Sequence, residues 1–214
     1  MSAQSDDGQN RRERILEAAT RLFAERGYDA TSTRAIADAV GLNIATVAYH
    51  VGGKPELYRA VMRRTHLAQR DVVTTALEQL ATCGSSGEET RAALLGFVDA
   101  YLSFCLSRPE VATLWIRRWL SDGADVTEIE HEFAGPLVAE VAGAVRAVLD
   151  RAGLGAGVDV EMLTFTIVWT AHSFGQAGII DPAGRRVGPR DLAVLDRFRR
   201  NLHAVVTGVL DQAT

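Results

Sequence analysis

Apolar residues recur at three- and four-residue steps along this 214-residue chain. That spacing places their side chains on one face of a helix, whereas a strand would alternate them between two faces. Residues 11–26 show the pattern first, and Gly27 ends this helix. No segment alternates like a strand beside a hairpin turn. The sequence therefore predicts an all-α fold of about nine helices.

Two short helices follow, in the form of a helix-turn-helix. Ser32 can cap the first helix, and Asn43 can cap the second, which runs to about Val51. Gly41 ends the first helix and begins the turn between them. A small apolar core is expected beneath the pair, made of Leu22, Phe23, Ile36, Ala37, Val40, Leu42 and Val47.

Longer helices fill the rest of the chain. Gly52-Gly53 precedes a helix that runs from Pro55 to about Thr82. Pro136 should break the helix that contains it, and residues 180–188 are predicted as a loop. The other helices are expected over residues 88–106, 109–120, 126–150, 160–177 and 189–210.

The charge of the chain is unevenly divided. A formal net charge of −4 argues against nucleic-acid binding, because such domains are usually basic. Residues 1–70, however, hold 11 Lys and Arg against 8 Asp and Glu, whereas residues 71–214 hold 12 against 19. The two parts are therefore expected to meet different partners. Cys83 and Cys105 lack the spacing of a metal or redox motif, which favours reduced thiols.

Residues 162–180 carry no formal charge and have about the length of a membrane-spanning helix. Six polar residues are spread around this segment, which would be costly in lipid. We therefore expect no membrane contact, and a helix covered by its own core on one face and by a second subunit on another. The first ten residues lack the apolar stretch of a secretory signal, so a cytoplasmic location is expected.

The second helix of the predicted helix-turn-helix presents an outward surface without acidic residues. A helix presented in this way can enter the major groove with its N-terminal residues at the base edges. Residues 11–58 also resemble the DNA-binding region of the tetracycline-repressor (TetR) family of bacterial regulators. The resemblance is carried by Ile15-Leu16, Ala18-Ala19, Leu22-Phe23, Gly27-Tyr28, Thr31-Ser32-Thr33, Ile36-Ala37, Gly41-Leu42, Thr46-Val47, Tyr49-His50, Lys54 and Leu57.

The resemblance implies a set of DNA contacts. Phosphate contacts would position the helix, and groove contacts would read the sequence. Ile44 has no hydrogen-bonding group, so it is expected to pack against a thymine methyl. The implied DNA-binding residues are Thr33, Arg34, Ile44, Ala45, Thr46, Tyr49, His50 and Lys54.

Several of these residues have a plainer interpretation. His50 could pack the end of its helix, and Tyr49 could be an ordinary surface aromatic. Arg11, Arg12 and Arg14 fit either a solvated tail or an arm that reaches DNA. An arm would steepen the salt dependence of binding by about 0.9 per neutralised phosphate. Three departures from the family pattern bear on docking, namely Ala48, Val51 and Pro55.

The acidic part of the chain is expected to bind a small-molecule effector. Aromatic residues at helical spacing suit an apolar cavity with a few polar groups, although such stripes are also common in plain cores. Tyr101, His172 and Gln176 are the candidate polar groups, and His172 also fits a satisfied core histidine. The full set of candidates is Phe97, Tyr101, Phe104, Trp115, Trp119, Phe133, Phe165, Trp169, His172 and Gln176.

A homodimer is expected, because one helix-turn-helix reads only a half-site and two half-sites lie about 34 Å apart. The last helix and the uncharged helix 160–177 can form a four-helix contact across a twofold axis, as the resemblance also implies. The candidate interface residues of the last helix are Leu195, Phe198, Leu202, Val205 and Val209.

Enzyme motifs are weak in this sequence. Residues 153–157 hold only part of a dinucleotide-binding turn, and no strand precedes them. The acidic run 128–132 lacks the spacing of a zinc site, so a solvated face is expected there. We therefore expect neither a catalytic activity, nor a cofactor, nor a metal ion.

The prediction is a transcriptional regulator of three regions: a disordered tail (1–10), a helix-turn-helix DNA-binding domain (11–54), and an effector-binding and dimerisation domain (55–214). It would bind a palindromic operator on double-stranded DNA as a dimer and be released by a small apolar or aromatic effector. Repression is what the family resemblance implies. The alternative is an all-helical ligand-binding module or enzyme that does not bind DNA.

Overall fold

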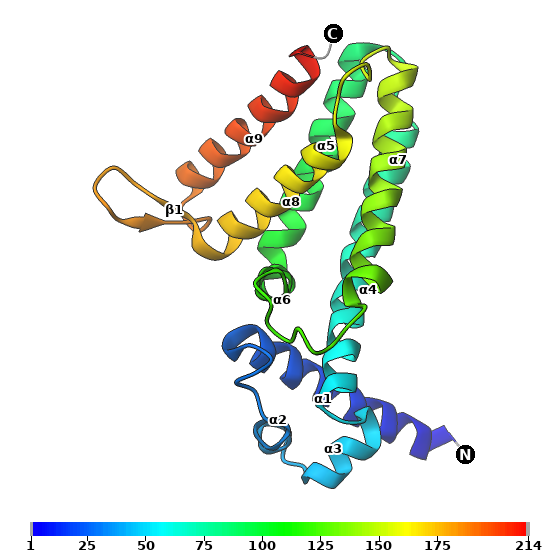
Figure 1. Ribbon diagram of the computed structural model, residues 1–214, viewed down its shortest axis with the longest axis vertical. Helices are drawn as coiled ribbons and strands as arrows, with labels where there is room; N and C mark the ends of the chain where they lie inside the picture. Colours follow the sequence, from blue (N-terminus) through cyan, green and yellow to red (C-terminus); the bar gives the residue numbers. More distant parts are fainter. Residues whose placement is uncertain (1, 213–214) are drawn as a thin grey trace. The chain divides into compact units, whose positions relative to one another are not determined.

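The computed structural model describes residues 2–212, and these residues form nine α-helices (Figure 1). The all-α class is therefore confirmed. The helices are α1 (Ser2–Arg26), α2 (Thr33–Val40), α3 (Ile44–Val51), α4 (Lys54–Ala81), α5 (Gly87–Ser107), α6 (Pro109–Trp119), α7 (Gly135–Arg151), α8 (Val160–Ala177) and α9 (Leu192–Gln212).

The chain divides into two compact units. Unit 1 comprises the chain up to Leu67 together with Thr113–Phe133, and unit 2 comprises Ala68–Ala112 and the chain from Ala134 onward. Helices α4 and α6 each contribute residues to both units. In this division the first half of α4 and a segment from the middle of the chain group with the helix-turn-helix, whereas the boundary predicted from the sequence is at residue 54.

In unit 1, α2 and α3 pack against α1 and against each other. The apolar stripe of α1 supplies most of this core, since Ile15, Ala19 and Phe23 are fully buried, and Ile36 and Val47 meet them from α2 and α3. Val40 and Leu42 are only partly covered. The predicted core is therefore confirmed at its centre and looser at the turn.

Both predicted helix caps are present. The Ser32 hydroxyl accepts a hydrogen bond from Ala35 N at 3.1 Å, and the Asn43 side chain accepts one from Thr46 N at 2.7 Å. Gly41 adopts a left-handed conformation with φ of 70° at the end of α2. Only glycine does this without steric cost, so the turn has the residue that its backbone needs.

Three predicted elements differ from the structure. Helix α1 begins at Ser2, so the disordered tail predicted over residues 1–10 is helical from residue 2. The helix predicted from residue 126 is instead a loop, followed by the short π-helix η1 (Glu130–Ala134), and α7 begins only at Gly135. The predicted loop after α8 contains a small antiparallel hairpin, β1 (Ile179–Ile180) and β2 (Arg186–Val187). Two-residue strands are too short to show an alternating pattern.

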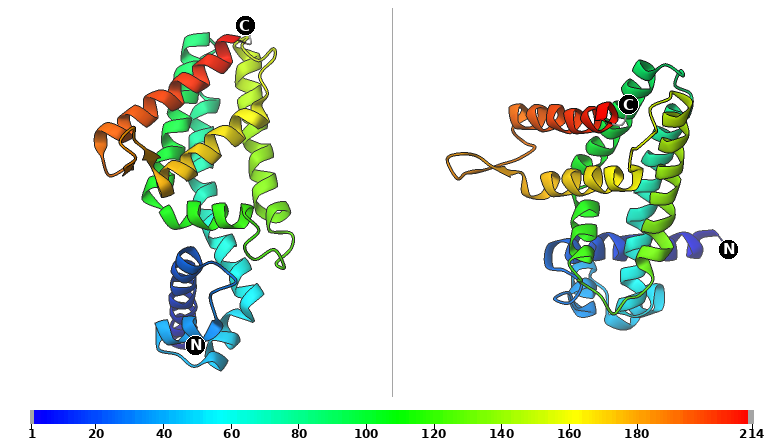
Figure 2. Two further views of the ribbon diagram at one scale, coloured as in Figure 1. Left: turned by 60° about the vertical axis from the view of Figure 1, so that its left-hand side comes forward. Right: turned by 45° about the horizontal axis from the view of Figure 1, so that its top comes forward.

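In unit 2, α5 packs against α7, α8 and α9, and α7 also packs against α8 (Figure 2). Leu102 and Leu149 are fully buried, and Phe174 of α8 stacks on Phe198 of α9 with ring centroids 3.9 Å apart. The hairpin projects from the ends of α8 and α9 that it connects (Figures 1 and 2). Among the residues that the structure describes, no helix has both the length and the apolar character to cross a bilayer.

Candidate nucleic-acid interface

Helix α3 has one buried face and one open face. Val47 and Val51 anchor it in unit 1, with 0% and 9% of their surfaces exposed. On the other face Ile44 is 40% exposed and Tyr49 is 86% exposed. Both side chains are therefore accessible from solvent on the face of α3 opposite its buried anchors.

The remaining predicted DNA-binding residues lie around this face. Arg34 and Ala45 are exposed, and Thr33, Thr46 and His50 are partly exposed. The segment that leads into α2 is joined to the end of α1 by Thr31, whose buried hydroxyl donates to Gly27 O at 2.6 Å. The structure thus brings the predicted set together on α2, α3 and the start of α4, and leaves each member with surface to offer.

The Lys54 side chain contacts the corner between α1 and α2 (residues 27–32). Its Nζ lies 4.2 Å from the centroid of the Tyr28 ring, and it donates a hydrogen bond of 3.4 Å to Asp29 O. A cation over an aromatic face is stabilised by the ring quadrupole. The sequence did not predict this arrangement, in which the ammonium group is oriented by residues outside the helix-turn-helix.

The three arginines of the basic cluster of α1, Arg11, Arg12 and Arg14, differ in their contacts. Arg14 donates to Val40 O at 3.1 Å and so satisfies a carbonyl at the end of α2, whereas Arg11 pairs with Asp7 at 2.7 Å. Arg14 therefore has a role in joining α1 to α2. Arg12 is exposed, and the contacts among the described residues give it no ion pair or hydrogen bond.

The segment after α6 was missed by sequence reasoning. The Asp122 carboxylate accepts hydrogen bonds from Tyr28 N at 2.8 and 3.0 Å and from Asp29 N at 3.3 Å. Arg117 donates two bonds of 3.0 Å, from Nε to Ala24 O and from Nη2 to Glu25 O. These residues are more than 90 positions apart in sequence, and no periodicity could have paired them.

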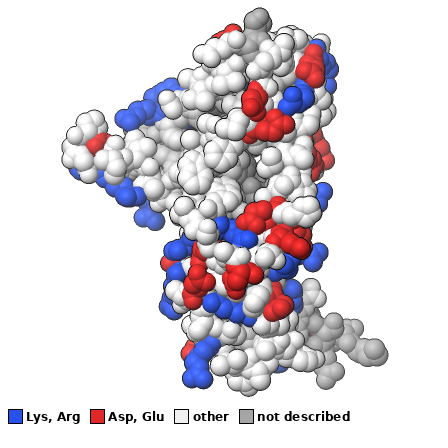
Figure 3. All heavy atoms as spheres, viewed as in Figure 1, with Lys and Arg blue, Asp and Glu red and all other residues white. Residues whose placement is uncertain are grey.

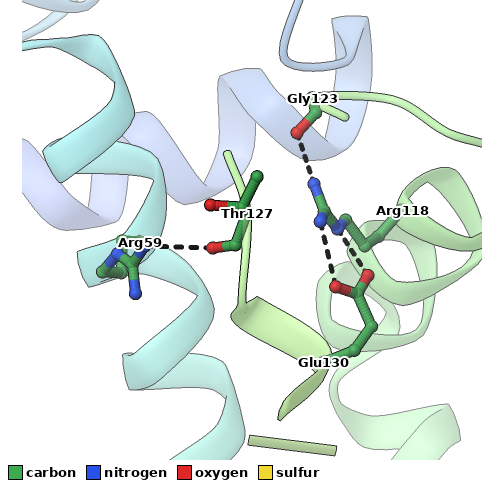
Figure 4. Close-up of polar contacts among 5 residues, drawn as sticks. All are labelled: Arg59, Arg118, Gly123, Thr127 and Glu130. Atoms are coloured by element: carbon green, nitrogen blue, oxygen red, sulfur yellow. Dashed lines mark hydrogen bonds and ion pairs between the residues drawn. The ribbon is translucent and has the colours of Figure 1, made fainter. Parts of the chain in front are cut away.

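Arg118 of α6 contacts Gly123 and Glu130, two residues of the segment that follows α6 (Figure 4). Its guanidinium group faces the Glu130 carboxylate, with Nε–Oε1 and Nη2–Oε2 distances of 2.6 and 2.9 Å, and Nη1 donates to Gly123 O. The hydrogen bonds from Arg118 hold the pKa of the Glu130 carboxyl below its usual range. Arg59 of α4 adds a bond of 3.0 Å to Thr127 O, so the loop is fastened at both sides (Figure 4).

An aromatic cluster lies beneath the corner. The Tyr58 ring is 4.8 Å from that of Tyr28 and meets Phe23 edge-on at 5.2 Å. Burial, assisted by the nearby Asp125 carboxylate, raises the pKa of Tyr28 to about 12, and burial also raises the pKa of Tyr58. Both phenols are therefore neutral throughout the physiological range.

In unit 2, two of the predicted effector-binding residues meet in a buried polar cluster. The Tyr101 hydroxyl lies 2.8 Å from His172 Nε2 and accepts a bond of 3.1 Å from Gln69 Nε2. Burial lowers the pKa of His172 to about 4 and raises the pKa of Tyr101. The cluster is thus neutral, and Gln69 is a member that the sequence pattern did not reveal.

The other predicted effector-binding residues are divided between the two units. Trp115, Trp119 and Phe133 belong to unit 1, whereas Phe97 and Phe104 lie on α5 in unit 2. Gln176 is exposed and donates to Pro109 O at 2.6 Å. Phe165 and Trp169 stack with each other at 6.2 Å on the outside of α8, with 57% and 36% of their surfaces exposed.

The predicted interface residues of α9 also differ in exposure. Leu202 is 3% exposed, so it belongs to the core of unit 2 with Val206 and Leu210. Val205 is 37% exposed, and Leu195, Phe198 and Val209 are partly covered. The clearest apolar surface is on α8, where Met162 is 57% exposed beside the Phe165–Trp169 pair. Figure 3 shows a largely uncharged surface over the middle of α8, with basic side chains over the hairpin.

Comparison with known proteins bears on this arrangement. Residues 15–61 match the family model described as "Bacterial regulatory proteins, tetR family". The resemblance to the TetR family is confirmed. The matched segment runs from α1 through α2 and α3 into α4, and so includes the open face of α3. TetR-family regulators are DNA-binding proteins and not enzymes, which supports the non-enzymatic interpretation.

Two curated relatives match part of the chain. The repressor AcnR of Corynebacterium glutamicum is 35% identical over 72 residues, which are 34% of this chain and 38% of AcnR. The activator FasR of Mycolicibacterium smegmatis is 35% identical over 89 residues, which are 42% of this chain and 39% of FasR. The matched part of the chain thus spans about two fifths of the length of these relatives.

The whole fold has a counterpart among solved structures. A TetR-family transcriptional regulator from Mesorhizobium loti has a TM-score of 0.67 and 20% sequence identity, with 95% of this chain and 96% of that one covered. At this identity the likeness concerns the fold alone. The fold of that structure therefore extends over the described chain, whereas the family model matches residues 15–61 only.

Proposed function

We propose that this chain is a sequence-specific DNA-binding transcriptional regulator of the TetR type. The observation that carries the proposal is the open face of α3. It exposes Ile44 and Tyr49 next to residues without negative charge, on a helix that matches the DNA-binding segment of the family. Such a helix fits the major groove, where its first residues reach base edges.

The proposed contacts fall into two kinds. Ile44, Ala45 and Thr46, in the first turn of α3, face the bases. Hydroxyl, imidazole and cationic groups around them hold the phosphates, which positions the helix without reading sequence. The proposed phosphate contacts are Thr33, Arg34, Tyr49, His50 and Lys54.

The regulator acts as a homodimer in this proposal. One α3 helix covers a half-site, so a palindromic operator requires two helix-turn-helix units, one from each protomer, about 34 Å apart. We call these two units the heads of the dimer. The exposed apolar residues Met162, Phe165 and Trp169 of α8 and Val205 of α9 support a self-complementary contact, because a patch of this kind is unfavourable in water. The dimer surface thus includes two residues that the sequence pattern placed among the effector contacts.

A small-molecule effector is proposed for unit 2. The buried cluster of Gln69, Tyr101 and His172 supplies neutral polar groups among apolar side chains, which is the usual composition of a small-molecule site. A neutral, mainly apolar or aromatic effector fits this cluster better than an ion, since no unpaired charge is buried there to balance one.

Release of DNA is proposed to follow from a two-state equilibrium. An effector that binds more tightly to the state with wrongly spaced heads shifts the dimer off its operator by its differential affinity. Helices α4 and α6 each continue from unit 2 into unit 1, so either one can carry a displacement between them. Repression is proposed as the output by analogy with the repressor AcnR, and activation, as in the relative FasR, is the alternative output.

Selection of bound fragments from random duplex DNA tests the proposal. The expected result is a palindrome whose half-sites are centred about 34–36 Å apart along the helix axis, one turn or a multiple of it. The logarithm of the association constant for the selected duplex should fall linearly with the logarithm of the salt concentration, because phosphate contacts release counterions. A pool that stays unenriched after repeated rounds at low salt would contradict the proposal.

A further inference from the structure

Unit 1 contains, besides the helix-turn-helix, the loop between α6 and η1 (residues 120–129). Asp122 reaches from this loop, and Arg117 reaches from the last turn of α6, to the end of α1 and to the corner that follows. We call this set of contacts the corner clasp. Arg117 satisfies carbonyls of the last turn of α1, which have no partner within the helix. Asp122 satisfies the amides of Tyr28 and Asp29 directly after it.

The corner is shaped to admit the clasp. Gly27 has φ of +88°, and a Cβ built there would lie 3.0 and 3.2 Å from the Asp122 carboxylate oxygens and 3.2 Å from Arg117 Nη1. Gly123 has φ of +69°, and its Cβ would lie 3.1 Å from the Tyr28 ring. Both glycines therefore allow a close approach that any side chain would obstruct.

The same corner holds Lys54. The Tyr28 ring lies under the Lys54 ammonium group, and the Asp29 carbonyl accepts its hydrogen bond. The backbone amides of these two residues are the groups that Asp122 binds. Two consecutive contacts thus join a carboxylate after α6 to a proposed phosphate contact at the start of α4.

We propose that Asp122 and Arg117 are positioning residues for operator binding, which fix the corner and through it the ammonium group of Lys54. The inference rests on the proposed function, since it assigns a role toward the same DNA surface. Arg118 supports the clasp indirectly, because its bonds to Glu130 and Gly123 O hold the Asp122 loop closed (Figure 4).

The sign of the effect distinguishes this role from simple electrostatics. Removal of a negative charge near DNA should strengthen binding if only net charge mattered. Asp122→Asn is instead expected to weaken binding of the selected operator by about tenfold, because each head then lacks its charge-assisted hydrogen bonds to the corner. The logarithmic salt slope should fall by about 0.9 for each phosphate that the variant no longer neutralises.

The matched control is Glu128→Gln. Glu128 lies in the same loop and is exposed, and no side-chain contact to the corner is seen for it. This variant removes the same charge and should leave operator affinity unchanged or slightly higher. Arg117→Lys keeps the charge of the clasp but has one nitrogen in place of the guanidinium fork, so an intermediate loss is expected.

A double-mutant cycle with Lys54→Gln tests the route. In the Lys54→Gln background, Asp122→Asn should weaken operator binding little further, because the ammonium group that Asp122 positions is absent. Thermal unfolding of each variant verifies that the chain is folded. If Asp122→Asn disturbs folding, Arg117→Lys in the same cycle gives the decisive comparison.

Two results would overturn the inference. One is a folded Asp122→Asn or Arg117→Lys variant with the wild-type dissociation constant and salt slope. The other is a loss of affinity that keeps its full size in the Lys54→Gln background. A wild-type chain that selects no duplex overturns the proposed function, and this inference with it, so the two failures are distinguishable.

Discussion

Single residues decide how the proposed head reads DNA. Ile44 is aliphatic, 40% exposed and in the first turn of α3, where a polar residue could have hydrogen-bonded to a base. Tyr49 is 86% exposed on the same face. Both side chains gain by leaving water when they meet a base or a sugar, so they favour DNA without adding charge.

Ile44→Ala tests the role of the aliphatic side chain. The variant lacks the groups that would contact a thymine methyl, and we expect operator binding about tenfold weaker. Preference for A·T over G·C at the contacted step should decrease with it, as measured by competition between the two duplexes. An unchanged preference at every step of the half-site would show that Ile44 does not read thymine.

The buried His172 predicts how the stability of the folded chain depends on pH. Burial lowers its pKa to about 4 from 6.5, so the folded chain holds this imidazole neutral while the unfolded chain protonates it below pH 6.5. Stability is unaffected above pH 6.5 and falls as the pH decreases from 6.5 to 4, by about 3 kcal/mol at most.

Denaturant unfolding between pH 7 and pH 4 measures this loss, with His172→Gln as the comparison. The variant should lose less stability than the wild type over this interval, because a glutamine does not titrate. Parallel pH profiles for the two proteins would contradict the assigned burial effect.

The sequence predicted those residues whose roles are local. Ser32 and Asn43 cap their own helices, and Gly41 turns its own backbone, so neighbouring residues were enough to assign them. Asp122 and Arg117 act on residues more than 90 positions away. Their partners depend on where the chain returns after several further helices, which no local pattern contains.

At the scale of elements, the chain's turns explain both the confirmed and the incorrect predictions. Helix α8 has the predicted bounds, since Asp159 caps it and Gly178 follows it. The helix predicted from residue 126 starts too early, because Glu128 has φ of 69°. A left-handed residue at this position is incompatible with a regular helix that begins at 126.

One substitution in the turn after α6 is expected to stabilise the folded chain. Ser121 adopts the left-handed conformation in which Asp122 N bonds to Arg117 O at 3.1 Å. Glycine takes this conformation without a Cβ clash, so Ser121→Gly should raise the free energy of unfolding by about 0.5–1 kcal/mol. Denaturant titration checks this value, and Ser103→Gly, at an exposed position inside α5, is a control that should destabilise the chain.

A destabilised Ser121→Gly variant would contradict the assignment of backbone strain to this position. Operator affinity is expected to stay at the wild-type value in the same variant, because the clasp residues are kept.

At the scale of the whole molecule, the charge distribution acquires a structural explanation. The net charge of −4 averages a weakly basic N-terminal part and an acidic remainder. Several cations of unit 1 are engaged within it, such as Arg117 on α1 carbonyls and Arg118 on Glu130. Because the N-terminal part is only weakly basic, DNA binding is expected to depend on paired half-sites and on docking geometry more than on bulk charge.

Dimerisation can be tested on α8. Phe165→Asp places a charge in the proposed apolar contact, and we expect monomers at micromolar concentration in light scattering, together with loss of tight operator binding. Leu120→Asp is the control, because Leu120 is 71% exposed in unit 1 and lies outside α8 and α9. A Phe165→Asp protein that remains dimeric would show that the interface lies elsewhere.

The most direct test of the central claim compares two duplexes in one titration: the selected operator, and the same duplex with both half-sites scrambled. At about 0.15 M salt the account predicts a dissociation constant for the operator at least about 10³-fold lower than for the scrambled duplex. Equal affinity for the two duplexes, or no measurable binding to either, would contradict a sequence-specific regulator.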